Sequence, residues 1–242
     1  MTDQKDRVYS KPLSTIDAFQ FDATVADIFQ DMIERSVPGY GFILQMIGSL
    51  AERYALAGSN VYDLGCSLGA STLQLRRHVP ATSHVIGVDN SKAMLDRCKA
   101  NMARDHSAAS YELLLEDLRT TCIENASMIV LNFTMQFIPD KERRHLLKRI
   151  ADGMLPGGIL LLAEKVRFES SSENNLMTDL HHDFKRYQGY SDLEIAQKRA
   201  ALENVLVPNT SAEHMERLSS AGFSSLQKCV RCLNFEAFLA IR

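Results

Sequence analysis

The residues best suited to chemistry follow a short apolar run at positions 61–64. Asp63 comes just before Gly65, and Gly69 lies four residues further on, in the pattern D-x-G-x-x-x-G. Because Gly65 has no Cβ atom, it can adopt backbone angles closed to other residues and let a ligand lie against the main chain. A helical pattern from Ala70 to His78 then offers unpaired N–H groups at its start. The stretch predicts a ligand-binding turn between a strand and a helix.

The spacing of this turn argues against two common nucleotide sites. Ser67 stands where the dinucleotide fingerprint G-x-G-x-x-G has its middle glycine, and the chain has no phosphate-cradling G-x-x-x-x-G-K-[ST]. The form D-x-G-x-x-x-G resembles the first motif of class I S-adenosylmethionine (SAM) methyltransferases. Its carboxylate suits a ligand with an ammonium and a sulfonium better than one with a pyrophosphate. A plain strand–turn–helix unit of an α/β sheet is the alternative.

A second acid supports a nucleoside-containing ligand. Asp89 ends the strand pattern that begins at His84. It lies roughly 20 residues past the glycine turn, where an acid reads the ribose hydroxyls in nucleotide-binding α/β folds. A carboxylate can accept two hydrogen bonds from a ribose diol. Ser91 is a favourable N-cap for a helix from Lys92 to Met102, and an exposed acid at a helix start is the alternative for Asp89.

The elements that must position these residues alternate along the chain. Predicted strands cover 61–64, 84–89, 111–115, 127–133 and 155–162, and predicted helices cover 70–78, 92–102 and 141–150. This alternation predicts a doubly wound, mostly parallel α/β sheet. A helix over 212–221, a strand through Val230 and a final strand from Leu233 to Ile241 are expected to complete it.

Ligands of such sheets bind at the carboxyl ends of the strands. Asp117 follows the third strand and could accept a hydrogen bond from an adenine amino group. Asn132 marks the end of the fourth strand, beside the expected position of the sulfonium. Tyr40 begins a helix after a break at 36–39, and it either covers the methionyl part of SAM or is a core aromatic.

Helical patterns precede and interrupt this alternation. Residues 1–21 are expected to form a loosely ordered lead-in, followed by a helical preface at about 22–57 that lies over the ligand site. Residues at about 166–208 are too many for a short connection, which predicts a helical insertion or lid. We expect a single domain over residues 1–242.

Composition favours a soluble enzyme. The chain has 242 residues, 45% of them apolar and 24% charged, and its net charge of −3 argues against direct nucleic-acid binding. No apolar run has the length of a membrane span, and the polar start at 1–6 lacks a signal-peptide core, so a cytoplasmic location is expected. The scattered cysteines, including Cys229 and Cys232 in one apparent strand, predict neither disulfides nor a metal site.

No residue type stands out as a nucleophile or a base. The motifs G-x-S-x-G and H-E-x-x-H are missing, and residues 132–135 (NFTM) replace the Asn-Pro-Pro-aromatic motif of amino-methylating enzymes. His181 and His182 either include a general base or form a patch on a helix surface. Arg199 could bind the carboxylate of an anionic ligand through its guanidinium fork, or be a solvated helix residue.

Beyond these motifs, nearly the whole chain resembles the carboxy-S-adenosyl-L-methionine (carboxy-SAM) synthase family, bacterial enzymes of the tRNA wobble-uridine modification pathway. The most specific stretches are 31–40 (DMIERSVPGY), 62–70 (YDLGCSLGA), 181–186 (HHDFKR), 197–199 (QKR) and 202–205 (LENV). The resemblance implies a Rossmann-like class I methyltransferase fold, with a mostly parallel seven-stranded sheet, N-terminal helices and a helical lid insertion.

The resemblance also implies an unusual reaction between SAM, as a substrate, and prephenate. Prephenate loses its ring carboxylate and hydroxide and becomes phenylpyruvate. A methyl proton leaves SAM, and the resulting sulfonium ylide captures the carbon dioxide to give carboxy-SAM, the carboxymethyl donor for the tRNA wobble uridine. The departing hydroxide could take the proton, so no general base of the protein and no metal are assigned.

The residues that the resemblance places around the ligand are Tyr40, Gly65, Cys66, Ser67, Asp89, Asn90, Asp117, Leu118, Asn132 and Arg199. Residues 65–67 would line the methionyl part, residues 89–90 the ribose and the adenine edge, and residues 117–118 the adenine. Asn132 and Tyr40 would lie near the sulfonium.

Arg199 would pair with the new carboxylate of carboxy-SAM, a contact that SAM cannot make. The resemblance further implies a homodimer, for which the lid helices are the expected contact. Two other functions stay open: a conventional SAM-dependent methyltransferase acting on a small acid, and a non-catalytic SAM-binding protein. Methyl transfer yields S-adenosylhomocysteine, carboxylation yields a heavier SAM, and a binding protein yields neither.

Overall fold

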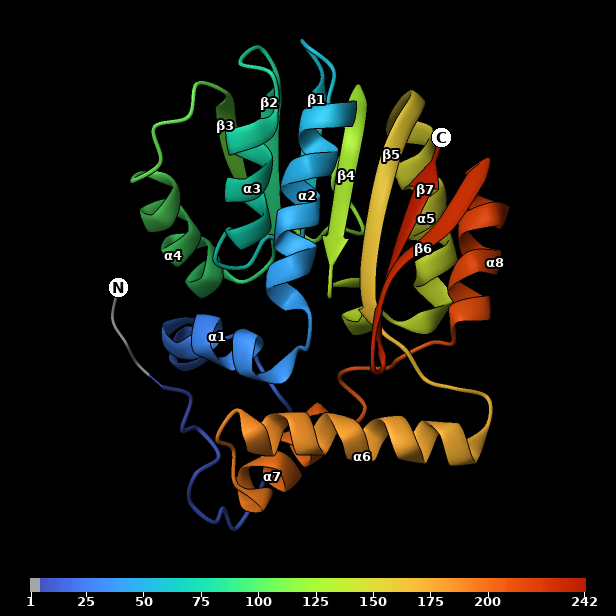
Figure 1. The fold of residues 1–242 in the computed structure, drawn as a ribbon. Coiled ribbons are helices and arrows are strands. Elements are labelled where there is room, and N and C mark those ends of the chain that lie inside the picture. The colour runs from blue at the N-terminus through green and yellow to red at the C-terminus, as the bar shows by residue number, and fades with distance from the viewer. Residues whose placement is uncertain (1–4) are drawn as a thin grey trace.

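A seven-stranded sheet lies at the centre of the computed structural model, which describes residues 5–242. The strand order is β3-β2-β1-β4-β5-β7-β6 (Figure 1). Neighbouring strands run parallel from β3 to β5, whereas β7 is antiparallel to both β5 and β6. The predicted mostly parallel sheet of the class I methyltransferase fold is confirmed.

The strands are β1 Asn60–Leu64, β2 His84–Asp89, β3 Ser110–Leu115, β4 Ala126–Asn132, β5 Met154–Lys165, β6 Ser225–Cys232 and β7 Phe235–Ile241. The helices are α1 Ala23–Ser36, α2 Tyr40–Tyr54, α3 Ala70–His78, α4 Lys92–Met102, α5 Asp140–Gly153, α6 Ser171–Tyr187, α7 Asp192–Leu202 and α8 Ser211–Ala221, with a 3-10 turn η1 at Met135–Phe137. The predicted elements lie at these places. The main difference is β5, which extends to Lys165. Its residues 163 and 164 are buried like those before them, so the strand continues past residue 162.

Alternating side chains of the central strands build one core on each face of the sheet. On β4, Met128 and Val130 belong to the core shared with α2 and α3, whereas Ile129 and Leu131 belong to the core shared with α5 and α8. All four side chains are fully buried. A strand buried on both faces reads as a continuous apolar run, and each such side chain stabilises the fold by roughly 1.5–3 kcal/mol.

Three helices cover the carboxyl edge of the sheet rather than its faces. Figure 1 shows α1, α6 and α7 together beyond the ends of β1, β4 and β5. α1 contacts α4 and α6, and α6 contacts α7. Within residues 5–242, no helix combines the length and the apolar content that crossing a membrane requires.

Residues 5–21 are anchored to α7, so the prediction of a loosely ordered lead-in is wrong for them. The side-chain amide of Gln197 donates a hydrogen bond to the carbonyl of Tyr9 at 2.9 Å. Its oxygen accepts one from the backbone N–H of Leu13 at 2.8 Å. Because these partners are far apart along the chain, no local sequence pattern predicts their hydrogen bonds. Residues 1–4 lie outside the described residues.

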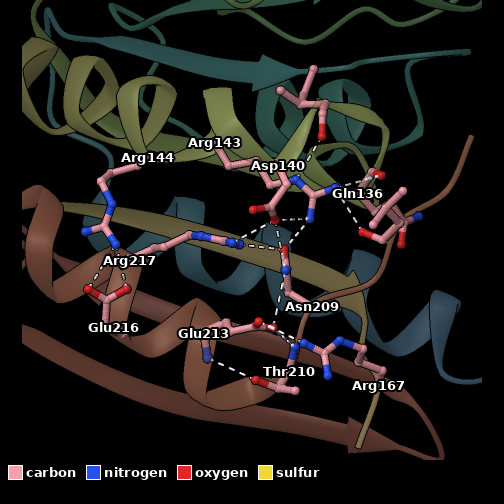
Figure 2. A network of polar contacts seen from close by, with 12 residues as sticks. Gln136, Asp140, Arg143, Arg144, Arg167, Asn209, Thr210, Glu213, Glu216 and Arg217 are labelled. Atoms are coloured by element: carbon pink, nitrogen blue, oxygen red, sulfur yellow. Dashed lines mark hydrogen bonds and ion pairs between the residues drawn. The ribbon is translucent and has the colours of Figure 1, made fainter. Parts of the chain in front are cut away.

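A buried arginine forms hydrogen bonds with the segment that leads from α7 back to the sheet (Figure 2). Arg143 of α5 is 1% exposed and donates to the carbonyls of Val207 at 2.9 Å and Gln136 at 3.2 Å. It also donates to the side-chain oxygen of Asn209 and to the carbonyl of Ile138. The network therefore joins the end of the lid segment to η1, the turn that follows β4.

We expect Arg143→Met to destabilise the fold by about 3–5 kcal/mol, because it leaves several buried carbonyls and an amide oxygen without their donor. The free energy of unfolding in urea measures this change. Arg144→Met is the matched control: Arg144 pairs with Glu216 at 3.0 Å, but both side chains are 57% exposed. Such a surface pair contributes less than about 1 kcal/mol. Similar losses in the two variants would contradict the role given to Arg143.

Candidate functional site

The turn after β1 folds onto the end of β2. The backbone N–H of Gly65 donates to the carbonyl of Val88 at 2.8 Å, and the N–H of Ser67 donates to a carboxylate oxygen of Asp89 at 2.9 Å. Gly65 has φ 85° and Ser67 has φ 49°, both in the left-handed region. The two predicted ligand motifs, one after each strand, are thus joined by a direct hydrogen bond.

Both glycines of the motif are required by close approach. A Cβ atom on Gly65 would lie 2.3 Å from Cγ2 of Thr134, and one on Gly69 would lie 2.7 Å from the sulfur of Cys98. Gly69 therefore lets the start of α3 pack against α4. Gly65 lets the turn after β1 touch the turn after β4.

Two acids stand near the carboxyl ends of β1 and β2. Asp63 is 1% exposed; one of its oxygens accepts from the hydroxyl of Thr72 at 2.6 Å, and the other is buried without a partner among residues 5–242. Burial raises the pKa of Asp63 to about 7, and the charge of Asp89 adds to this shift. Burial also raises the pKa of Asp89, although the N–H of Ser91 donates to it at 2.8 Å. Such acids favour a ligand that brings a positive charge or hydrogen-bond donors.

Asn132 reaches the same edge from β4. Its amide nitrogen donates to the hydroxyl of Ser71 at 3.0 Å, and its amide oxygen is buried without a partner in the described residues. The next residue, Phe133, has its ring centroid 6.4 Å from that of Tyr40. Tyr40 is only 8% exposed, so its ring is a core aromatic at this edge. A contact of Tyr40 with SAM stays a prediction.

The predicted adenine side follows β3, at the edge next to β2. The backbone N–H of Glu116 donates to the carbonyl of Asp89 at 3.1 Å, which ties this loop to the ribose side. Arg119 donates to Asp117 from its backbone and from its Nε, both at 2.9 Å, and these bonds lower the pKa of Asp117. Leu118 is buried and Asn90 is exposed. Asp117 thus already has a partner that the sequence does not reveal, and its contact with adenine stays a prediction.

Arg199 approaches the site from α7. It is exposed and forms no ion pair within residues 5–242. Burial lowers the pKa of Lys165, at the end of β5, and the charge of Arg199 adds to this shift. Among residues 5–242, no hydrogen bond joins Arg199 to the turn at 65–69, and its contact with a carboxylate stays a prediction.

The two adjacent histidines differ sharply in environment. His181 is 4% exposed, and its Nε2 donates to the carbonyl of Ser36 at 2.8 Å. Burial lowers the pKa of His181 to about 2, so the ring is neutral. The surface-patch alternative is wrong for His181, which instead packs its ring edge-on against Phe235 at 5.0 Å. His182 is half-buried, and burial lowers its pKa too.

The structure adds residues that sequence reasoning did not single out. Lys165 ends β5, Lys185 is buried on α6, and Phe133 and Phe235 pack together with ring centroids 5.8 Å apart. A lysine at the end of an apolar strand is a signal that could have identified Lys165. Lys185 stands in a charged run that reads as a solvated helix face.

Comparison with known proteins identifies close relatives over the full chain. Residues 61–158 match the model of a methyltransferase domain. The chain is 54% identical to the carboxy-S-adenosyl-L-methionine synthase of Hahella chejuensis, with all of both chains covered. It is 51% identical to that of Trichlorobacter lovleyi, again over all of both chains. It is 50% identical to that of Mannheimia succiniciproducens, over 98% of this chain and 99% of the relative.

Solved structures share the fold at low sequence identity. A putative SAM-dependent methyltransferase of Methanococcus maripaludis has a TM-score of 0.60 and 18% identity, over 95% of this chain and 96% of that one. Human N-acetylserotonin methyltransferase in complex with SAM has a TM-score of 0.62 and 18% identity, over 91% of this chain and 55% of that one. These likenesses concern the fold alone.

Gly65→Ala should be clearly more destabilising than Gly58→Ala. Both glycines have positive φ, 85° and 75°, so alanine is strained at both by about 1–2 kcal/mol. Only at Gly65 does the new methyl group overlap Thr134, whereas nothing lies within 4 Å at Gly58. We expect overpacking to add about 1–3 kcal/mol at Gly65, measured by urea unfolding. Equal losses would show that the contact with Thr134 relaxes freely.

Proposed function

This chain belongs to the carboxy-S-adenosyl-L-methionine synthase family, and we propose that it makes carboxy-SAM from SAM with prephenate as the source of the carboxylate. The observation that carries this proposal is the 54% identity to a synthase of that name over the full length of both chains. The charges at the carboxyl edge support it, because acids line the turn after β1 and cations gather at the end of β5.

The acidic side fits SAM. Within the described part of the chain, Asp63 and Asn132 each leave one buried oxygen without a partner, and such oxygens bind a donor-bearing cation well. The methionyl part would lie over residues 65–67, the ribose and the adenine edge against residues 89–90, and the adenine toward residues 117–118. The Gly65 turn leaves no side chain between the ligand and the backbone.

The reaction balances without a protein base. The prephenate dianion breaks the bond to its ring carboxylate and releases carbon dioxide and hydroxide, which leaves aromatic phenylpyruvate with one carboxylate. The hydroxide takes a methyl proton of SAM and becomes water. The deprotonated methyl carbon then forms the new bond to carbon dioxide. The charge of −1 on the reactants equals that on the products, one phenylpyruvate anion and neutral carboxy-SAM.

The work left to the protein is positioning and the exclusion of water. Water would protonate the methyl carbon and carry off the carbon dioxide. The helices α1, α6 and α7 lie over the carboxyl edge where this must be prevented. Arg199 of α7 would bind the new carboxylate through its guanidinium group, a contact that would favour carboxy-SAM over SAM.

The assembly and location of the protein are parts of the same proposal. An exposed apolar row on α6 supports a homodimer through the lid helices, with Leu176, Leu180 and Tyr187 at 54%, 39% and 89% exposure. All five cysteines are free, which supports a reducing, cytoplasmic setting. The net charge of −3 supports the expectation that the protein does not bind nucleic acid directly. A single domain over residues 1–242 remains part of the proposal.

Mass spectrometry of the products tests the function. The purified protein is incubated with SAM alone, with prephenate alone and with both. We expect SAM to become heavier by one carbon dioxide, with an equal amount of phenylpyruvate, only when both substrates are present. Formation of S-adenosylhomocysteine with an added acid would instead show a conventional methyltransferase. Unchanged SAM and intact prephenate would overturn the proposal and leave a SAM-binding protein.

A further inference from the structure

Two lysines at the carboxyl edge have no ion-pair partner among residues 5–242. Lys185 on α6 is 8% exposed, and Lys165 at the end of β5 is half-buried. Within residues 5–242 neither is within ion-pair distance of a carboxylate. The neighbouring buried Lys198 differs, because its Nζ lies 3.4 Å from Asp6 and 3.0 Å from the hydroxyl of Ser36. A buried cation that makes no such pair is costly to the fold unless another molecule brings the anion.

Other positive charges act on both lysines. Burial lowers the pKa of Lys185 to about 7, and the charges of Lys198 and Lys165 add to the shift. Burial, and then the charge of Arg199, lowers the pKa of Lys165. Asp6 is the one acid that acts on Lys185, and it already accepts a 2.6 Å hydrogen bond from Tyr190 and pairs with Lys198. Lys165, Lys185 and Lys198 therefore act on one another as like charges, and only Lys198 has an ion-pair partner among residues 5–242.

A row of buried aromatic rings connects this region with the SAM side. Phe235 starts β7 and is the register partner of Lys165 on β5. Its ring lies 5.8 Å from that of Phe133, the residue that follows Asn132 at the end of β4. Its other neighbour is the neutral ring of His181, at 5.0 Å. Cation and apolar wall thus stand next to each other, as an anionic ligand with an unsaturated ring requires.

We propose that Lys165 and Lys185 bind the carboxylate that the second substrate keeps, with Phe235 beside its ring. The inference rests on the proposed function and deepens it. Prephenate carries two carboxylates, and only the ring carboxylate is transferred. If Arg199 receives that carboxylate in its new place on SAM, the carboxylate that remains in phenylpyruvate needs a separate cation. Lys165 and Lys185 are the cations that can bind this second carboxylate.

Lys165→Met and Lys185→Met test the assignment. Methionine keeps the length of the side chain, and removing a buried charge without a partner leaves stability unchanged or improves it. We expect the KM for prephenate to rise roughly 10- to 100-fold in each variant, the loss of a charge-assisted hydrogen bond. The Kd for SAM should change less than about twofold. Lys165→Arg should recover most of the prephenate affinity. Lys99→Met, which removes an exposed lysine of α4, is the control for general charge effects.

Inhibition by phenylpyruvate distinguishes the binding sites of the two carboxylates, because this product carries only the carboxylate that prephenate keeps. We expect its inhibition constant to rise roughly 10-fold or more in the two lysine variants and to stay nearly constant in Arg199→Met. Carboxy-SAM should show the reverse pattern. Unchanged KM and inhibition constants in both lysine variants, with a wild type that makes carboxy-SAM, would overturn this inference. A wild type that makes no carboxy-SAM would instead overturn the proposed function.

Discussion

Buried charged groups determine which ligands the carboxyl edge of this sheet can bind. Among residues 5–242, a carboxylate oxygen of Asp63 is buried without a partner on one side, and Lys165 and Lys185 have no ion-pair partner on the other. Burying each of these groups without a partner lowers the stability of the fold. Under the proposed function, the acidic side would bind SAM and the cationic side would bind the carboxylate that prephenate keeps. A ligand of opposite charge would offset the cost of burying these groups, so the same groups would give the site its selectivity.

The rest of the fold holds these halves in place. Parallel strands bring the ends of β2, β1, β4 and β5 to one edge in that order. The Ser67–Asp89 hydrogen bond and the contact of Gly65 with Thr134 lock neighbouring turns together. On the lid side, the Arg143 network fixes the segment that returns from α7 to the sheet. The lid is therefore tied at the edge where water must be excluded.

The sequence predicts which polar residues follow the strands, but it does not predict which cations of α6 are buried. The turn at 65–69, Asp89 and Asn132 each follow a strand, and strand order alone brings such positions together. Lys185 and His181 belong to a charged run on α6, and only packing against Ser36 and the sheet shows that this face is buried. The same holds for residues 5–21, whose anchor on Gln197 depends on contacts far apart in the chain. The position of Asp117 after β3 can be predicted from the sequence, whereas its ion pair with Arg119 cannot.

Under the proposed function, a carboxylate passes from prephenate to SAM inside a site closed to water. Prephenate labelled with carbon-13 in its ring carboxylate, supplied with SAM in buffer that contains unlabelled bicarbonate, tests this most directly. Mass spectrometry of the carboxy-SAM formed gives the fraction that carries the label. The account predicts that nearly all of it is labelled, whatever the bicarbonate concentration. Label that falls as bicarbonate rises would show that the carbon dioxide mixes with solvent, and would contradict a sealed transfer.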